Sequence, residues 1–131
     1  MNNLEQYSVL VVDDDNVMRE VLKSILRSGD YFIAGEASNG SDAIQLCLQT
    51  HPSIVLLDIN MPQMDGLKTL EEIRKVSSAT IVLMVSADST MERMRDAIDS
   101  GAAGFIVKPF NADMILDRVA ACLKSGKFLE H

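Results

Sequence analysis

The sequence is poor in the features that mark secreted and membrane-spanning proteins. Cysteine occurs only twice, as Cys47 and Cys122, without the spacing of a metal site. No apolar stretch approaches the ~20 residues that cross a membrane. The start "MNNLEQY" lacks the basic region of a secretory signal. The sequence therefore predicts a soluble, cytoplasmic protein with two reduced thiols that are not bonded to each other.

Positive charge and linker-like segments are also scarce. Lysine and arginine together number 12, against 19 aspartates and glutamates, and the net charge of -7 disfavours electrostatic binding of nucleic acid or anionic membranes. Without a low-complexity segment or a shift in composition, 131 residues fit one domain. We place it at residues 1–128 and interpret the ending "LEH" (129–131) as the remnant of an expression tag.

Short apolar runs alternate along the chain with segments of helical periodicity. The runs occupy residues 7–12, 31–37, 53–58, 80–86 and 104–108. Three of them are rich in Val, Ile and Leu without alternation, as strands covered on both faces are. Five strand–helix repeats predict an α/β fold, a five-stranded parallel sheet with helices on both faces.

Each helical segment carries an apolar stripe that we expect to face the sheet. The stripes are Val17, Met18, Val21, Leu22, Ile25 and Leu26; Ile44, Cys47 and Leu48; Leu67, Leu70 and Ile73; Met91, Met94 and Ile98; and Ile115, Val119 and Leu123. Asn111 is a good N-cap for the last segment. We expect the methionine stripe to be mostly core, although eight methionines leave room for a soft partner surface.

Carboxylates gather where the predicted strands end, which is where ligands bind in such sheets. The residues at these ends are Asp13 to Asp15, Asp58, Ser86 and Lys108. The glycines that bring backbone amides to a phosphate are missing after the first strand, so a dinucleotide or flavin site is disfavoured. An acidic run alone also fits a solvated turn. A hard cation with oxygen ligands, such as Mg²⁺, fits the whole set better.

Four motifs in order give the chain a family resemblance from about Ser8 to Lys124. They are "VVDDDN", "LLDINMPQMDG", "VSA" and "VKPF". Together they resemble the CheY-like receiver domain of two-component response regulators. The resemblance implies a flavodoxin-like (βα)5 fold, in agreement with the periodicity. It also implies a phosphoacceptor signalling switch and not an enzyme, apart from its own phosphorylation and dephosphorylation. The phosphoryl group would come from a sensor histidine kinase, a phosphotransfer protein or a small phosphodonor.

The resemblance also implies a role for each residue at the strand ends. Asp58 is the phosphoacceptor, with Lys108 and Ser86 contacting the phosphoryl group. Mg²⁺ is bound by Asp13 (directly or through water), Asp14, Asp58 and the backbone carbonyl of Asn60. Asp15 has no ligand role and is solvated. Ser86 and Phe105 form the switch pair, and the Lys108–Pro109 peptide bond is cis. The charges agree with this assignment, because three aspartates and one lysine sum to -2, which one Mg²⁺ neutralises.

Two questions stay open at the level of sequence. A phosphohydrolase that forms an aspartyl-phosphate is the alternative class, but it needs a second acid two residues after the nucleophile, where this chain has Asn60. The domain is either a stand-alone CheY-like regulator or a receiver cut from a longer one. In both cases, we expect the segments around 91–98, 104–108 and 111–123 to form the face that contacts an effector or output domain.

Overall fold

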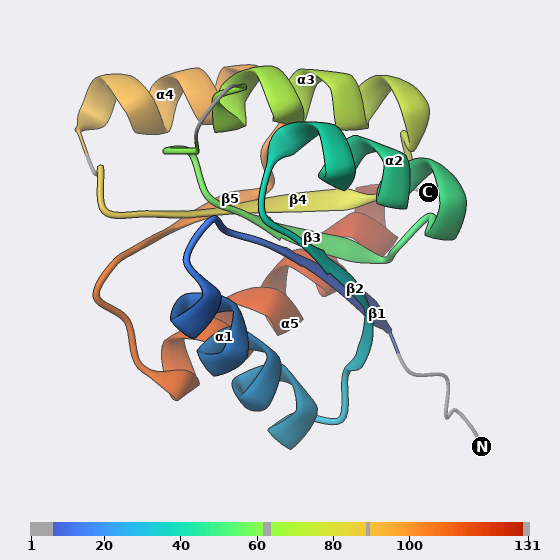
Figure 1. Cartoon of the computed structure of the whole chain (residues 1–131), viewed down its shortest axis with the longest axis vertical. Coiled ribbons are helices and arrows are strands. Elements are labelled where there is room, and N and C mark those ends of the chain that lie inside the picture. The colour runs from blue at the N-terminus through green and yellow to red at the C-terminus, as the bar shows by residue number, and fades with distance from the viewer. Residues whose placement is uncertain (1–6, 62–63, 89, 130–131) are drawn as a thin grey trace.

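The structure of the protein, a computed structural model, describes residues 7–61, 64–88 and 90–129, with side chains up to residue 124. Within these ranges five strands alternate with five helices (Figure 1). The strands are β1 (Ser8–Val12), β2 (Phe32–Ala37), β3 (Ile54–Leu57), β4 (Ile81–Ser86) and β5 (Gly104–Val107). The helices are α1 (Asn16–Ser28), α2 (Gly40–Thr50), α3 (Gly66–Val76), α4 (Met91–Asp99) and α5 (Ala112–Leu129).

The strands form one parallel sheet in the order β2-β1-β3-β4-β5. The chain moves outward from β1 to β2 and then returns to the other side of β1 to form β3. The direction of winding therefore reverses between β1 and β3, and this reversal opens a crevice at their carboxyl ends. The predicted fold class is confirmed.

The helices form two layers, with α1 and α5 on one face of the sheet and α2, α3 and α4 on the other (Figure 1). Alternate residues of a strand point to opposite faces. In β1, Leu10 and Val12 join the core beneath α2 and α3, whereas Val9 and Val11 join the core beneath α1 and α5. Because both faces are covered, the strand needs apolar residues at every position, which explains the unbroken run in the sequence.

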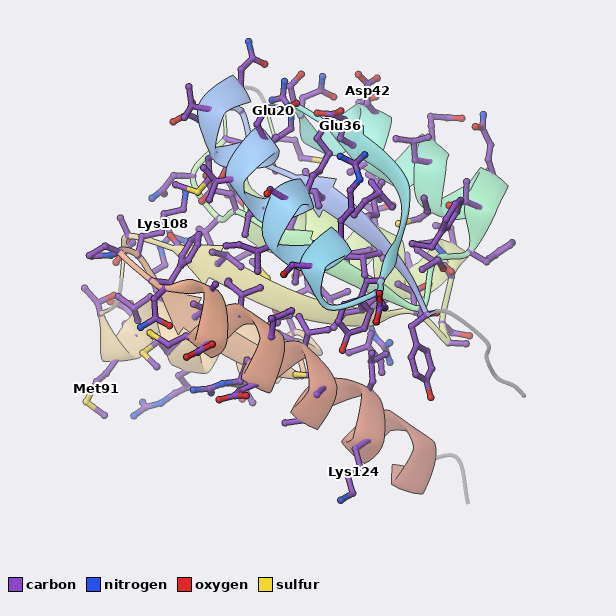
Figure 2. The ribbon with its side chains drawn as sticks, turned by 90° about the horizontal axis from the view of Figure 1, so that it is seen from below. Glu20, Glu36, Asp42, Met91, Lys108 and Lys124 are labelled. Atoms are coloured by element: carbon purple, nitrogen blue, oxygen red, sulfur yellow. The ribbon has the colours of Figure 1, made fainter. Side chains whose placement is uncertain are left out.

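The predicted apolar stripes are confirmed for α3 and α5 and partly wrong elsewhere. Leu70, Ile73, Ile115, Val119 and Leu123 are buried, but Val17, Val21, Leu48, Met91 and Ile98 are exposed. On α4 the small Ala97 faces the sheet, so Met91 is 76% exposed and points away from the molecule (Figure 2). A helix contacts the sheet along a narrow strip of its surface. Apolar residues at the margins of a predicted stripe therefore stay exposed.

Three smaller predictions are also resolved by the structure. Asn111 caps α5, because its Oδ1 accepts a hydrogen bond from the Met114 N–H at 2.9 Å. Cys47 on α2 and Cys122 on α5 lie on opposite faces and are both free thiols. The Lys108–Pro109 bond is cis. All three predictions are confirmed.

Two further findings concern the membrane and the end of the chain. In the described part of the chain, no helix combines the length and the apolar character needed to span a membrane. The helix α5 extends to Leu129, and residues 130–131 of the predicted tag remnant lie outside the described residues. The boundary at residue 128 therefore stays a prediction.

Candidate functional site

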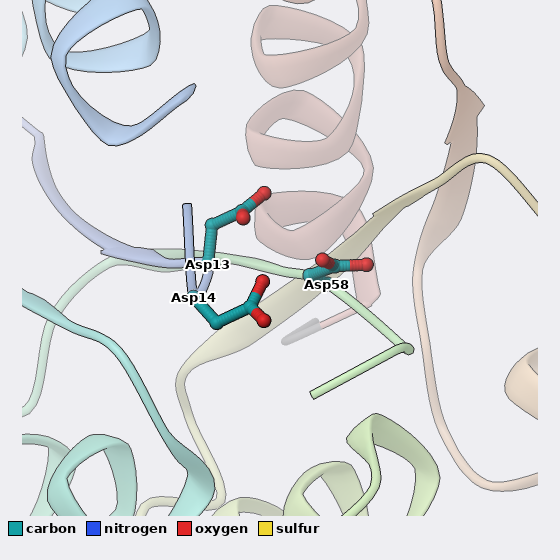
Figure 3. A group of neighbouring side chains, drawn as sticks. All are labelled: Asp13, Asp14 and Asp58. Carbon is teal, nitrogen blue, oxygen red and sulfur yellow. The ribbon is translucent and has the colours of Figure 1, made fainter. Parts of the chain in front are cut away.

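Three carboxylates meet at the carboxyl ends of β1 and β3. Val12 and Leu57 are opposite each other in the parallel register, so Asp13 and Asp58 follow at the same edge of the sheet. Asp13, Asp14 and Asp58 each offer an oxygen within 4.8 Å of the other two, and Figure 3 shows the three side chains around a common space. Asp13 and Asp58 are buried, whereas Asp14 is exposed to solvent. The topology thus assembles the predicted acidic cluster.

Among the described residues, Lys108 supplies the single positive charge that forms ion pairs with these carboxylates. It follows β5, and its Nζ lies 2.9 Å from Asp13 Oδ2 and 3.5 Å from Asp58 Oδ2. Its backbone N–H donates to the carbonyl of Ser86 at 2.9 Å, which fixes the end of β5 against β4. One ammonium group therefore pairs with two buried carboxylates.

Short-range backbone hydrogen bonds orient the two buried carboxylates. Asp13 Oδ1 accepts from the Asp15 N–H at 2.9 Å, and Asp58 Oδ1 accepts from the Asn60 N–H at 3.2 Å. In each case one oxygen is bound by its own loop and the other faces Lys108. Asn60 lies beside the acceptor as predicted, but its carbonyl as a metal ligand stays a prediction.

Burial and the neighbouring charges shift the pKa values of two groups in the site. Burial raises the pKa of the Asp58 carboxyl, and repulsion by Asp13 adds to this, although Lys108 and the Asn60 N–H oppose it. Burial works against the charge of Lys108. Its hydrogen bond to Asp13 and the nearby charges of Asp58 and Asp13 outweigh burial and raise the pKa of the ammonium. Lys108 thus stays protonated while the cluster keeps an excess of negative charge.

The donor set matches a hard divalent cation. Every side-chain ligand in the cluster is a carboxylate oxygen, the type that Mg²⁺ prefers. Among the described residues, none donates a hydrogen bond to the Asp14 carboxylate, so both of its oxygens are available for a ligand or for water. A cation would also offset the burial and the repulsion by Asp13 that together raise the pKa of the Asp58 carboxyl. The residues therefore fit Mg²⁺.

Ser86 and Phe105 lie on neighbouring strands behind the acidic cluster. Ser86 ends β4 and is fully buried, and its Oγ accepts from the Asp88 N–H at 3.2 Å. Among the described residues no acceptor takes the hydroxyl hydrogen, which can therefore be donated to a group that enters the crevice. Phe105 on β5 is buried in the same core as Met84 and Ala97. The coupling between Ser86 and Phe105 stays a prediction.

Sequence reasoning missed two residues that shape the site. Asp15 is the N-cap of α1, because its side chain accepts from the Val17 N–H at 2.9 Å, so the third aspartate of the run starts a helix. Gly66, the first residue of α3, donates its N–H to the Ile59 carbonyl at 2.7 Å. A Cβ at position 66 would overlap the Asp58 carbonyl and lie 2.5 Å from Ile59 Cα. The "MDG" that ends the second motif was a usable signal for this contact.

Comparisons with known families, sequences and structures all find response regulators or their receiver domains. The family model described as the response regulator receiver domain matches residues 9–120. The chemotaxis protein CheY of Listeria monocytogenes is 40% identical over 88% of this chain and 98% of its own length. The nitrate/nitrite response regulator NarL of Escherichia coli is 33% identical over 88% of this chain but 54% of its own length. The solved CheX–CheY–BeF3–Mg²⁺ complex from Borrelia burgdorferi has a TM-score of 0.85 at 33% identity, covering 88% of this chain and 87% of that one.

Proposed function

Because the chain belongs to the response regulator receiver domain family, we propose that Asp58 accepts a phosphoryl group and thereby switches the domain between two signalling states. The family is a signalling domain and not a conventional enzyme. The observation that carries the proposal is the buried Asp58 carboxylate, grouped with two further aspartates and contacted by Lys108 at 3.5 Å. The phosphoryl donor would be a sensor histidine kinase, a phosphotransfer protein or a small acyl phosphate.

The chemistry is an in-line displacement at phosphorus. An oxygen of Asp58 forms the new O–P bond while the bond between phosphorus and the donor's nitrogen or oxygen breaks, and the leaving group keeps the electron pair. The Lys108 ammonium is close enough to contact the oxygens of the transferred group and to offset their charge. The Ser86 hydroxyl then donates a hydrogen bond to one of these oxygens.

The acidic cluster is the proposed site of Mg²⁺. Asp13, Asp14 and Asp58, together with the backbone carbonyl of Asn60, would hold the ion. When bound, Mg²⁺ supplies positive charge beside the phosphoryl oxygens. The solved Borrelia CheY complex contains both Mg²⁺ and BeF3, which supports the same chemistry in this chain.

The proposed output surface is the face formed by α4, β5 and α5. Met91, Ile98 and Met114 are all exposed, as a surface that binds a partner requires. The comparisons leave both organisations open, since CheY is matched over nearly its whole length and NarL over about half. An output domain or a separate effector could therefore contact this face, and the cytoplasmic location stays a prediction of the sequence.

The proposal is tested by intact mass spectrometry after incubation with acetyl phosphate and Mg²⁺. The unmodified chain should gain one phosphoryl group, and Asp58→Asn should gain none. Asp117→Asn, on the exposed side of α5, is the matched control and should be labelled like the unmodified chain. Full labelling of Asp58→Asn would overturn the assignment. Rapid multiple turnover of a phosphate monoester would instead favour the phosphohydrolase alternative.

A further inference from the structure

Arg19 connects the acidic loop to two other parts of the molecule. It lies near the start of α1, and its side chain is only 13% exposed. Its Nη1 donates to the Asp13 carbonyl oxygen at 2.6 Å and its Nε donates to Glu36 Oε1 on β2 at 2.9 Å. Nη2 donates to Asn16 Oδ1. The planar guanidinium thus contacts the β1–α1 loop, α1 and β2 at once, which a single ammonium group cannot do in this geometry.

The Asp13 carbonyl needs such a partner because the sheet ends there. The preceding carbonyl, that of Val12, accepts the Asp58 N–H at 3.0 Å. The Asp13 N–H still donates to Ala37 on β2 at 3.1 Å. Beyond this point the chain turns into the loop that carries Asp13 and Asp14, and the Asp13 carbonyl is bound by Arg19. Arg19 therefore fixes the backbone directly beneath the two carboxylates.

The anchor of Arg19 on β2 is itself held in place. Glu36 also accepts from Lys23 Nζ at 2.5 Å, and Lys23 pairs with Glu20 at 2.8 Å. Glu20 and Glu36 are labelled in Figure 2. The hydrogen bonds from Lys23 and then Arg19 lower the pKa of the Glu36 carboxyl, so it stays ionised at neutral pH. Lys23 contacts Glu36 as Arg19 does. Among the described residues its hydrogen bonds and ion pairs are with Glu36 and Glu20, and not with the Asp13 carbonyl.

We propose that Arg19 is a positioning residue that holds Asp13 and Asp14 in the geometry for binding a divalent cation. Two carboxylates about 4 Å apart repel by roughly 4 kcal/mol at an effective dielectric near 20. A loop that is free to move would relieve this repulsion by spreading. Arg19 opposes this movement of the loop because it holds the Asp13 carbonyl by a hydrogen bond. The inference rests on the proposed function of the cluster as a Mg²⁺ site.

The test compares Arg19→Met with Lys23→Met. Both variants remove one positive charge and one partner of Glu36, but only Arg19 contacts the Asp13 carbonyl. Titration with Mg²⁺ followed by NMR should give about tenfold weaker binding for Arg19→Met, the usual effect of removing a partner behind a metal ligand. Lys23→Met should stay within about twofold of the unmodified chain.

A second measurement needs no metal. The Asp15 amide, which donates to Asp13 Oδ1, should exchange with solvent faster in metal-free Arg19→Met than in metal-free Lys23→Met. Equal behaviour of the two variants in both measurements would overturn the positioning role. If the unmodified chain binds no Mg²⁺, the proposed metal site fails, and the Asp15 amide still decides the role of Arg19. If Arg19→Met does not fold, Arg19→Gln, which lacks the guanidinium, takes its place.

Discussion

The Asp58 carboxylate is buried and lies beside two other carboxylates, those of Asp13 and Asp14. Burial and repulsion by Asp13 raise the pKa of its carboxyl, and the single ammonium of Lys108 serves both aspartates. A carboxyl group whose pKa is higher in the folded state destabilises the fold once it ionises. Stability is therefore greatest below the pKa of the unfolded state and is lost as the pH rises through the raised pKa. At neutral pH the ionised, metal-free Asp58 therefore lowers the free energy of unfolding, and other interactions of the fold offset this cost.

Replacing this charge should stabilise the metal-free protein. Asp58→Asn keeps the shape of the side chain and removes the repulsion, so the free energy of unfolding in urea at pH 7 should rise by about 1 kcal/mol. Addition of Mg²⁺ should stabilise the unmodified chain and leave the variant nearly unchanged. A variant that unfolds at a lower urea concentration than the unmodified chain would show that the Asp58 charge does not destabilise the metal-free fold.

Lys108 should have opposite effects on stability and on cation binding. Lys108→Ala leaves the buried Asp13 without its ion pair, so the free energy of unfolding should fall by about 2 kcal/mol. The same change makes the cluster more negative, so Mg²⁺ should bind more tightly in an NMR titration. Weaker Mg²⁺ binding would mean that Lys108 orders the ligands more than it repels the ion.

The contact between α3 and the acceptor loop explains why a glycine follows Asp65. A Cβ at position 66 would overlap the Asp58 backbone, so Gly66→Ala should push α3 away from the loop, lower stability by about 2 kcal/mol and slow labelling by acetyl phosphate. Gly35→Ala on β2 is the control, since its Cβ would meet side chains at 3.5 Å or more. Urea unfolding and timed mass spectrometry measure both effects. Equal behaviour of the two variants would contradict the close approach.

At the scale of elements, the sequence predicts the strands and their polar ends better than the contacts of the helices. The unbroken apolar runs reveal strands covered on both faces, and the rule for parallel sheets then brings Asp13, Asp58 and Lys108 together. The rotation of a helix is harder to infer, because α4 could present either the methionines or the small Ala97 to the sheet. The role of Arg19 leaves no local signal, since its anchor lies 17 residues away on β2.

At the scale of the whole molecule, we expect the acceptor site and the output face to change together. Binding of beryllofluoride at Asp58 should shift the NMR resonances of Ser86, Phe105 and α4 in parallel. The buried Phe105 ring packs in the core with Ala97 of α4, which offers a route between them. Asp58→Asn, which lacks the acceptor carboxylate, is the control and should show no shifts. Movement of Ser86 alone, with Phe105 and α4 unchanged, would contradict the coupling.

Locating the phosphoryl group tests directly whether Asp58 is the phosphoacceptor. Borohydride reduces an aspartyl-phosphate to homoserine, and peptide mass spectrometry then identifies the position that has changed. After treatment with acetyl phosphate and Mg²⁺, we expect homoserine at position 58 and unchanged aspartate at positions 13 and 14. Homoserine at Asp13 or Asp14, or none at Asp58 in a chain that has gained a phosphoryl group, would contradict it.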